Sequence, residues 1–298
     1  MLRPKVKVMT PQQLVTEIES LVSLPDVCVK VNRLIDAPNY SALTLGEIIS
    51  QDTDLSARLL SLVNSAFFNL KSPVETISRA VTVIGTSELR DLVMATTAAR
   101  IFTGIPADLV DMAEYWRYSI TTGVIAGDLA RQCNVLHSER LFVMGVLHDI
   151  GRLAIYLKMP QQARDILLIA GGNDMLLPDA ENDILGFTHM DVGGALLRKW
   201  KLPESIVSVI ANHHRPASTN VFQLETSILF LATLLAYANS NGVDWKEAIE
   251  LVEPLVWNNT GLKPEQLEPI VEQTPRKVME IMDVVLGPKI RPIKSQPH

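Results

Sequence analysis

Histidine and carboxylate side chains gather in three short motifs of this chain, and they are the residues best suited to carry chemistry. One motif is an adjacent His-Asp pair, one places a carboxylate two residues after a histidine, and one is a His-His pair. Imidazole and carboxylate groups are ligands that suit divalent zinc, iron and manganese. The motifs therefore predict a candidate metal site. Its candidate ligands are His148, Asp149, His189, His213 and His214, with Asp191 close to them in sequence.

Each motif also has a structural interpretation, which the residues alone leave open. A buried histidine can be held by a neighbouring carboxylate, so His148 and Asp149 fit a hydrogen-bonded pair between helices. His189 lies where the first turn of a helix is expected. His213 and His214 lie where a helix is expected to end, and a histidine there interacts well with free carbonyl groups.

The segments that position these motifs have helical periodicity almost throughout, so we expect an all-α fold. Thr10 and Gln13 match a capping box at the start of the first helix. Thr188 and Asp191 match another, directly around His189. No segment alternates at period two for long enough to predict a strand.

The expected boundary between two helical lobes lies at Ile105-Pro106. We predict an N-terminal lobe over residues 1–105 and a second lobe over residues 106–290. Residues 291–298 form the end of a proline-containing tail and are expected to be loose.

Several helix boundaries are predicted from single residues. Thr44 with Glu47 predicts a capping box for a short helix, and Asp54 is the expected N-cap of the next one. The segment after the lobe boundary predicts a long helix from about residue 107 to residue 132. The last two expected helices cover about 264–271 and 275–286.

Composition excludes several classes of function. The 298-residue chain has 27 basic and 33 acidic residues and a net charge of −6, opposite in sign to a typical nucleic-acid binder. No apolar run approaches the roughly 18 residues of a membrane span, and no apolar segment of a signal peptide follows the basic start. We therefore expect no membrane and no direct nucleic-acid contact. The two cysteines, Cys28 and Cys133, favour a reducing cytoplasm.

Four separated segments occur in the order typical of one family. Residues 141–155, LFVMGVLHDIGRLAI, resemble the core of the HD superfamily around its His-Asp pair. Residues 51–95 resemble the N-terminal part of the HDOD domain, a divergent branch of HD-type proteins. The segments 185–200 and 202–214 continue the pattern. The resemblance to HDOD proteins covers roughly residues 11–240.

This resemblance implies an N-terminal helical lobe packed on an HD-like helical bundle. It also implies a role in bacterial signal transduction, because HDOD domains often follow receiver domains or accompany cyclic-dinucleotide enzymes. Catalytic activity is not generally established for HDOD domains. The parent HD enzymes are metal-dependent phosphohydrolases, in which a bound metal activates water for attack on a phosphoester.

The HD ligands are an early histidine, the His-Asp pair and a late aspartate. The pair is kept as His148 and Asp149, but Tyr118 stands at the early histidine and Thr233 at the late aspartate. Phenol and hydroxyl groups replace imidazole and carboxylate poorly around a divalent ion. The implied ligand set is therefore incomplete. Dinuclear HD enzymes use further histidines downstream, and the candidates for that role here are His189, His213 and His214.

We accordingly expect a bacterial HDOD signalling module that needs no cofactor and binds a signalling protein, such as a receiver domain, or a nucleotide-type small ligand. The first alternative is a phosphohydrolase of a nucleotide or cyclic dinucleotide, with Fe, Mn or Zn held at His148 and Asp149 by help from the later histidines. A second alternative is a regulator that contacts nucleic acid through a local patch, which the net charge of −6 disfavours. The 47% apolar composition is also compatible with a homodimer.

Overall fold

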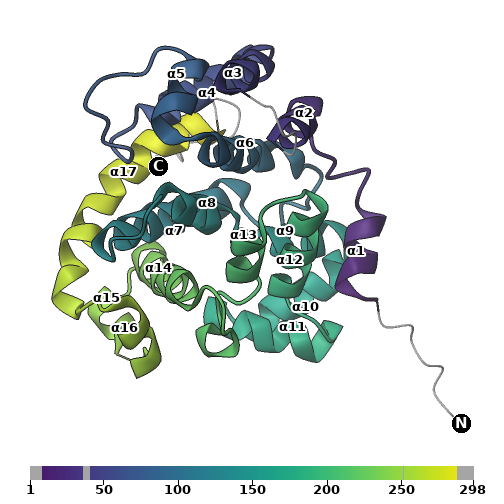
Figure 1. Cartoon of the computed structure of the whole chain (residues 1–298). Coiled ribbons are helices and arrows are strands. Elements are labelled where there is room, and N and C mark those ends of the chain that lie inside the picture. The colour runs from purple at the N-terminus through teal and green to yellow at the C-terminus, as the bar shows by residue number, and fades with distance from the viewer. Residues whose placement is uncertain (1–8, 36–40, 251, 287–298) are drawn as a thin grey trace, which may run out of the picture.

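The computed structural model describes residues 9–35, 41–250 and 252–286, and every regular element in these ranges is a helix. The described ranges contain 17 α-helices, three short 3₁₀ helices and no strand (Figure 1). The expected all-α fold is therefore confirmed. The predicted loose tail, 291–298, lies outside the described residues.

Five helices in the first third of the chain form a layer along one side of the molecule, at the top of Figure 1. They are α2 (Asp26–Ile35), α3 (Ala42–Ser50), α4 (Thr53–Val63), α5 (Ile77–Ile84) and α6 (Thr86–Ile101). Helix α3 packs on α5, while α2 and α4 both pack on α6. Leu45, Leu59 and Leu89 are fully buried in this layer, so it has an apolar core of its own.

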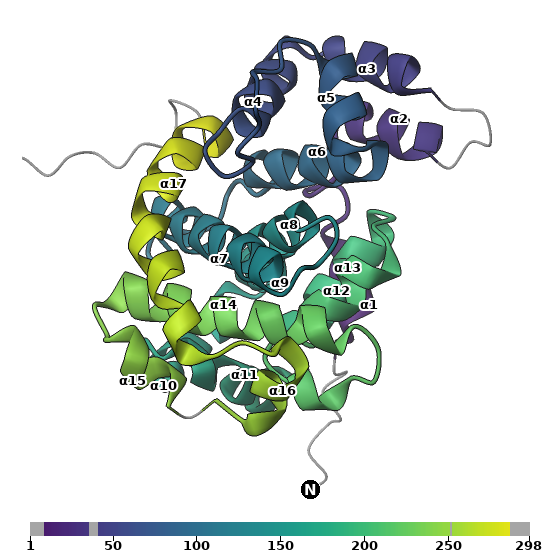
Figure 2. The ribbon, with the colours of Figure 1, turned by 60° about the vertical axis from the view of Figure 1, so that its left-hand side comes forward.

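A larger bundle contains most of the remaining helices. Its central helix, α7 (Met112–Gln132), packs against α8 (Glu139–Leu147) and α14 (Gln223–Asn241). Figure 2 shows α7 and α8 between α6 on one side and α14 on the other. The other α-helices are α9 (Ile150–Lys158), α10 (Pro160–Ala170), α11 (Leu177–Leu185), α12 (His189–Lys199), α13 (Glu204–Ile210), α15 (Trp245–Ile249), α16 (Pro254–Thr260) and α17 (Glu268–Leu286). The 3₁₀ helices are η1 (Asp174–Leu176), η2 (Pro216–Ser218) and η3 (Pro264–Gln266).

The first and last helices join regions that are distant in sequence. Helix α1 (Pro11–Glu17) packs on α12 and α9 of the bundle, although the layer follows it in the chain. Helix α17 packs along α7 and also contacts α4 and α6 of the layer (Figures 1 and 2). The Asn32 side-chain amide in α2 donates a hydrogen bond to the Trp200 carbonyl, at 2.9 Å. Layer and bundle thus share contacts, and the division near residue 105 stays a prediction.

Two predicted capping boxes are present. The Thr10 hydroxyl accepts a hydrogen bond from the Gln13 backbone, and the Gln13 side chain accepts one from the Thr10 backbone. Thr188 and Asp191 make the same reciprocal pair at the start of α12. The second box fixes the helical position of His189, which is the first residue of α12.

The start predicted for the long helix near residue 107 is wrong. Helix α7 begins at Met112, because the Asp111 carboxylate accepts hydrogen bonds from the backbone N–H groups of Ala113 and Glu114. An aspartate cap satisfies donors that would otherwise be free at a helix start. The Asp111 cap therefore places the start of the helix at Met112 instead of near residue 107.

Two other predicted caps are wrong for a similar reason. The Ser41 hydroxyl, rather than Thr44, caps α3 by accepting from the Thr44 backbone N–H at 3.1 Å. The Asp52 carboxylate, rather than Asp54, caps α4 by accepting from the Leu55 backbone N–H at 2.9 Å. In each case an earlier residue has the extended backbone that an N-cap requires.

The predicted break between 264–271 and 275–286 is also wrong, because α17 continues through Pro275. Proline removes one backbone donor from a helix interior and disfavours helix at this position. Packing of α17 on α7, α4 and α6 offsets that loss.

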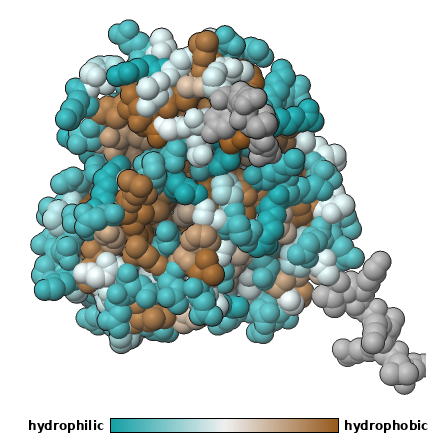
Figure 3. All heavy atoms as spheres, viewed as in Figure 1, coloured by the Kyte–Doolittle hydropathy of each residue, from teal (hydrophilic) through white to brown (hydrophobic). Residues whose placement is uncertain are grey.

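The surface is mixed in character. Figure 3 shows hydrophobic patches separated by larger hydrophilic areas on the face seen in Figure 1. Single large apolar residues are also exposed, among them Leu136 at 81% and Leu168 at 83%. Among the helices of the described ranges, none combines the length and apolar character that crossing a lipid bilayer requires.

Candidate metal centre

Three helix ends bring the predicted residues together. The His-Asp pair occupies the junction between α8, which ends at Leu147, and α9, which begins at Ile150. His189 opens α12, while His213 and His214 lie in the turn after α13. Each side chain lies at the end of a rigid helix, so the packing of these helices sets the distances between the side chains.

Close helix packing makes this convergence possible. A Cβ atom on Gly151 of α9 would overlap the His189 carbonyl oxygen, whereas one on Gly193 in the same contact would keep an ordinary 3.6 Å distance to its nearest neighbour. At the other side of the pair, a Cβ on Gly145 would lie 2.5 Å from Gly123 Cα. Gly151 and Gly145 therefore let the backbones of α9 and α8 approach their neighbours.

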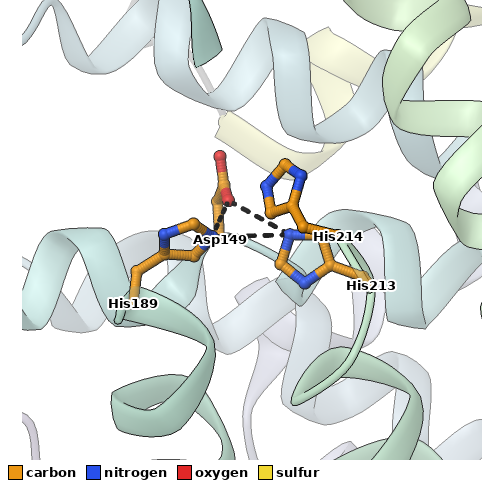
Figure 4. A group of neighbouring side chains, drawn as sticks. All are labelled: Asp149, His189, His213 and His214. Atoms are coloured by element: carbon orange, nitrogen blue, oxygen red, sulfur yellow. Dashed lines mark hydrogen bonds and ion pairs between the residues drawn. The ribbon is translucent and has the colours of Figure 1, made fainter. Parts of the chain in front are cut away.

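Four side chains point toward one another in Figure 4: Asp149, His189, His213 and His214. Asp149 Oδ1 lies 3.3 Å from His189 Nε2 and 3.7 Å from His213 Nε2. The two Nε2 atoms are 3.5 Å apart. One candidate ligand atom of each of the four residues lies within 4.8 Å of the others. The structure thus brings four of the five predicted ligands into one cluster.

Hydrogen bonds fix the orientation of two imidazoles. His213 Nδ1 lies 2.7 Å from the Ile210 carbonyl, which can only accept, so Nδ1 carries the proton. His189 Nδ1 lies 2.7 Å from a carboxylate oxygen of Glu181, and that oxygen also accepts from the His189 backbone N–H. Both imidazoles therefore direct Nε2 into the cluster. Such outer partners orient histidine ligands in metal sites.

Three inward-facing atoms meet inside the cluster without a hydrogen bond to the Asp149 carboxylate. Asp149 Oδ1 is buried and has no hydrogen bond, and it faces His189 Nε2 and His213 Nε2. The exposed fractions of these three residues are 2%, 0% and 0%. Buried polar atoms without partners are costly. A single divalent cation would satisfy all three atoms, so the residues fit a metal ion.

Burial keeps most of the imidazoles neutral, the form in which histidine binds metals. It lowers the pKa of His213 and holds the pKa of His214 well below the ordinary histidine value. Burial also lowers the pKa of His189, but the adjacent Glu181 carboxylate outweighs it and raises this pKa overall. The pKa of His189 is therefore set by the group that orients it.

The second carboxylate oxygen of Asp149 is neutralised separately. Arg152 Nη1 lies 2.7 Å from Asp149 Oδ2 and 3.4 Å from Asp174 Oδ1. Burial alone would raise the pKa of Asp149, but His148 and Arg152 hold it well below the ordinary aspartate value. Asp149 is therefore an anion with one oxygen engaged by arginine and one facing the histidines.

The fifth predicted ligand, His148, lies beside the cluster. Its Nδ1 lies 2.7 Å from the Gly145 carbonyl, and its Nε2 lies 3.4 Å from Asp149 Oδ2. Burial lowers its pKa to about 4. The ring also makes an edge-on contact with His213, with centroids 5.1 Å apart. His148 thus faces the Asp149 oxygen that Arg152 occupies.

Tyr118 and Thr233, which stand where HD enzymes are expected to have ligands, meet at this site. The Tyr118 hydroxyl lies 3.4 Å from the Thr233 carbonyl, and the Tyr118 ring lies 5.5 Å from the His148 ring. The Thr233 hydroxyl donates to the Phe230 carbonyl at 2.7 Å. Burial raises the pKa of Tyr118 well above its ordinary value, so the phenol stays neutral. Neither position supplies an anionic or imidazole ligand.

Two supporting residues were missed from the sequence. Arg152 lies one helical turn after Asp149, and an arginine at that spacing was a usable signal. Glu181 lies eight residues before His189 and reaches it across the turn between α11 and α12. No local pattern marks such a contact.

Comparison with known proteins agrees with the fold. The HDOD domain family matches residues 21–216, which is more than half of the chain. The chain therefore belongs to the HDOD family. An uncharacterised protein of Treponema pallidum (strain Nichols) is 26% identical over 201 residues. That match covers 66% of this chain but only 38% of the relative.

Three solved structures share the fold. A candidate phosphohydrolase from Shewanella amazonensis SB2B has a TM-score of 0.70 and 24% identity, with 91% of this chain and 97% of that chain covered. An HDOD domain protein of unknown function from Geobacter sulfurreducens has a TM-score of 0.68 and 22% identity, covering 93% and 97%. A candidate signal transduction protein from Marinobacter aquaeolei VT8 has a TM-score of 0.67 and 22% identity, covering 91% and 60%. At these identities the likeness concerns the fold alone.

Proposed function

We propose that this HDOD protein is a signal-transduction module that acts by binding a partner, and that the Asp149 cluster holds a divalent metal ion in a structural role. The observation that carries the proposal is the buried Asp149 Oδ1, which has no hydrogen bond and faces His189 Nε2 and His213 Nε2 at 3.3 and 3.7 Å. Zinc, iron and manganese all accept this donor set.

The number of ligands favours a structural over a catalytic role. Asp149, His189, His213 and His214 offer four ligands, as structural zinc sites do, whereas catalytic zinc sites keep three protein ligands and one open position. When bound, the metal would cross-link α9, α12 and the turn after α13. The exposed fractions of 0–2% for the first three ligands also leave little room for a substrate beside them.

The protein's own residues prepare this site. Glu181 and the Ile210 carbonyl orient the two imidazoles, and Arg152 balances the Asp149 oxygen that faces away from them. A cluster held in this way would fix the positions of three helix ends relative to one another. That rigid region would support a binding surface formed elsewhere on the bundle.

The partner belongs to the proposal as well. Membership of the HDOD family supports a signalling protein, such as a receiver domain, as the partner, with a nucleotide-type small ligand as the alternative. Cys28 and Cys133 are free thiols, which supports a cytoplasmic location. Exposed apolar residues such as Leu168 support a homodimer as one form of association.

One observation favours a second candidate, a metal-dependent phosphohydrolase. His214 belongs to the cluster and also lines an open cavity of about 380 Å³ together with Arg215 and Phe230. A phosphate group in this cavity would lie near both a positive side chain and a cluster ligand. The replacement of expected ligands by Tyr118 and Thr233 counts against this candidate.

Elemental mass spectrometry on protein purified without a histidine tag and dialysed extensively tests the proposal. We expect about one tightly bound Zn, Fe or Mn per chain in the wild type and none in His213→Ala. Asn212→Ala is the matched control, since Asn212 lies next to His213 and, within the described residues, its side chain forms hydrogen bonds with Ser208 and Ser218 rather than with the cluster. Circular dichroism on each variant separates metal loss from unfolding.

Absence of metal from the wild type, after purification and after refolding with Zn²⁺, would overturn the structural metal site. Assays of metal-loaded protein with nucleotides and cyclic dinucleotides test the role. We expect no turnover above that of His213→Ala. Turnover that is lost in His213→Ala would favour the phosphohydrolase instead.

A further inference from the structure

A second group of metal-ligating side chains lies outside the Asp149 cluster, where the layer meets the bundle. Glu88 lies in the first turn of α6, His137 in the loop between α7 and α8, and Glu139 at the first residue of α8. His137 was not among the predicted ligands. One candidate ligand atom of each residue lies within 4.8 Å of the other two.

The two distances from His137 in this group match those between ligands of one small cation. His137 Nδ1 lies 3.4 Å from Glu88 Oε1 and 3.3 Å from Glu139 Oε1. Zinc binds histidine nitrogen and carboxylate oxygen at about 2.0–2.2 Å, so two ligands of a tetrahedral ion are about 3.3–3.5 Å apart. Both measured distances fall in that interval.

A hydrogen bond alone explains only half of this arrangement. His137 Nδ1 can carry one proton, which gives one good hydrogen bond, yet two carboxylates approach this nitrogen at nearly equal distances. Each carboxylate also lies in the first turn of a helix, where negative charge is favoured. That position explains why each residue is acidic but not why both converge on one nitrogen.

Neighbouring cations are already engaged. Arg90 donates both of its hydrogen bonds to Asp91, and Arg140 donates to the Ser205 hydroxyl. Within the described part of the chain, neither Glu88 nor Glu139 forms an ion pair with a lysine or an arginine.

Glu88 is the most informative member of the group. Its side chain is nine-tenths buried and makes no hydrogen bond within the described residues, and its ion-pair contact there is with His137 at 3.4 Å. A buried carboxylate without donors is costly. This carboxylate is directed at the same imidazole that Glu139 approaches.

We propose that Glu88, His137 and Glu139 form a second divalent-cation site, suited to Zn²⁺, which clips α6 of the layer to the start of α8 in the bundle. The His137 side chain is 46% exposed, so an ion can reach the site from solvent. With three protein ligands and this exposure, the site would exchange its metal more readily than the buried Asp149 cluster.

The test is titration of dialysed protein with Zn²⁺ against a competing chromophoric chelator. We expect His137→Ala to bind one equivalent of Zn²⁺ fewer than the wild type, or to bind that equivalent of Zn²⁺ at least about tenfold more weakly. Glu139→Gln should lower the affinity for the same equivalent of Zn²⁺. Glu247→Gln is the matched control, because Glu247 is an exposed glutamate in the first turn of α15, as Glu139 lies in the first turn of α8.

The difference between wild type and His137→Ala does not depend on the Asp149 cluster, so this test stands even if that cluster binds nothing. His137 is exposed, and thermal unfolding without metal should show that His137→Ala is folded. Added Zn²⁺ should raise the melting temperature of the wild type more than that of His137→Ala. Identical Zn²⁺ titrations for the two proteins would overturn the second site.

Discussion

Two buried aspartates of this protein, Asp149 and Asp91, each pair with an arginine, yet their pKa values move in opposite directions. Asp149 is 2% exposed and Asp91 is 0% exposed, so burial is nearly equal. Burial raises the pKa of Asp91 to about 6, because Arg90 only partly offsets it. For Asp149 the same burial is outweighed by His148 and Arg152, and the pKa lies well below its ordinary value.

The two aspartates also differ in what faces their unpaired oxygen. In Asp91, Arg90 occupies Oδ1, and Oδ2 has no hydrogen bond, with Arg140 Nε at 3.9 Å. That neighbour is itself a donor and can bind no metal. In Asp149, the unpaired oxygen faces the Nε2 atoms of His189 and His213, which can. A buried carboxylate is therefore a candidate ligand only where its free oxygen meets further ligands.

The largest expected effect comes from forcing α9 and α12 apart. Gly151→Ala would place a Cβ atom on the His189 carbonyl oxygen, and this backbone atom cannot easily move away. We expect a loss of at least about 3 kcal/mol in the free energy of unfolding, together with loss of the tightly bound metal. Urea denaturation and elemental analysis measure the two effects.

Gly193→Ala is the control for this contact, because its Cβ would meet nothing closer than 3.6 Å. Alanine favours helix over glycine, so this variant should be stabilised by up to about 1 kcal/mol. If both variants were equally stable, close approach of the two helices would not be what positions His189.

The next prediction separates the orientation of the His189 imidazole from its binding of a metal. Glu181→Gln keeps the shape of the side chain but removes the charge that holds His189 Nδ1. We expect the affinity of the Asp149 cluster for Zn²⁺ to fall about 10–100-fold, measured by chelator competition. Glu204→Gln removes a carboxylate from an exposed pair with Arg198 and should leave the affinity unchanged. An unchanged affinity in Glu181→Gln would show that His189 needs no outer partner.

A smaller effect concerns Asp91. Its folded pKa of about 6 lies above the ordinary 3.8, so the folded protein holds the proton more tightly than the unfolded chain between these values. Stability due to this group is therefore greatest at low pH and falls as the pH rises through about 4 to 6. Relative to Asp91→Asn, the wild type should lose on the order of 1–2 kcal/mol over this window.

Urea denaturation of both proteins at several pH values provides the measurement. Asp108→Asn is the control, because Arg164 lowers the pKa of this exposed aspartate and moves its titration below the window. A constant stability difference between the wild type and Asp91→Asn from about pH 4 to 7 would contradict the raised pKa of Asp91.

The smallest effect is expected at Tyr118. Its hydroxyl contact with the Thr233 carbonyl is long, at 3.4 Å, so Tyr118→Phe should cost less than about 1 kcal/mol in urea denaturation. Metal content should not change, since a neutral phenol is no ligand of the proposed site. Loss of metal in Tyr118→Phe would place Tyr118 among the ligands.

Sequence reasoning identified the clustered histidines better than the residues that orient them. His189, His213 and His214 stand out because histidine is rare in this chain and each sits at a helix end. The role of Glu181 depends on how α11 and α12 pack, and no periodicity within either helix encodes that angle. The convergence of Glu88 with His137 depends on packing between layer and bundle in the same way.

Prediction of the fold shows the same contrast between local signals and long-range packing. The capping box at Thr188 is local, and it was found because two residues three positions apart decide it. The continuity of α17 through Pro275 was missed because contacts with α4, α6 and α7 outweigh the local signal. Local chemistry marked the starts of α1 and α12, whereas long-range packing decided that α17 continues through Pro275.

The docking of α1 on α12 has a consequence for biosynthesis. Leu14, Val15 and Ile18 of the α1 region leave the ribosome well before their partner helix α12, which ends only at Lys199. A closure over so many residues carries an entropic cost and comes late in folding. Until then the apolar face of α1 lacks the cover that α12 provides, and during synthesis it is a place where chaperones or other nascent chains can bind.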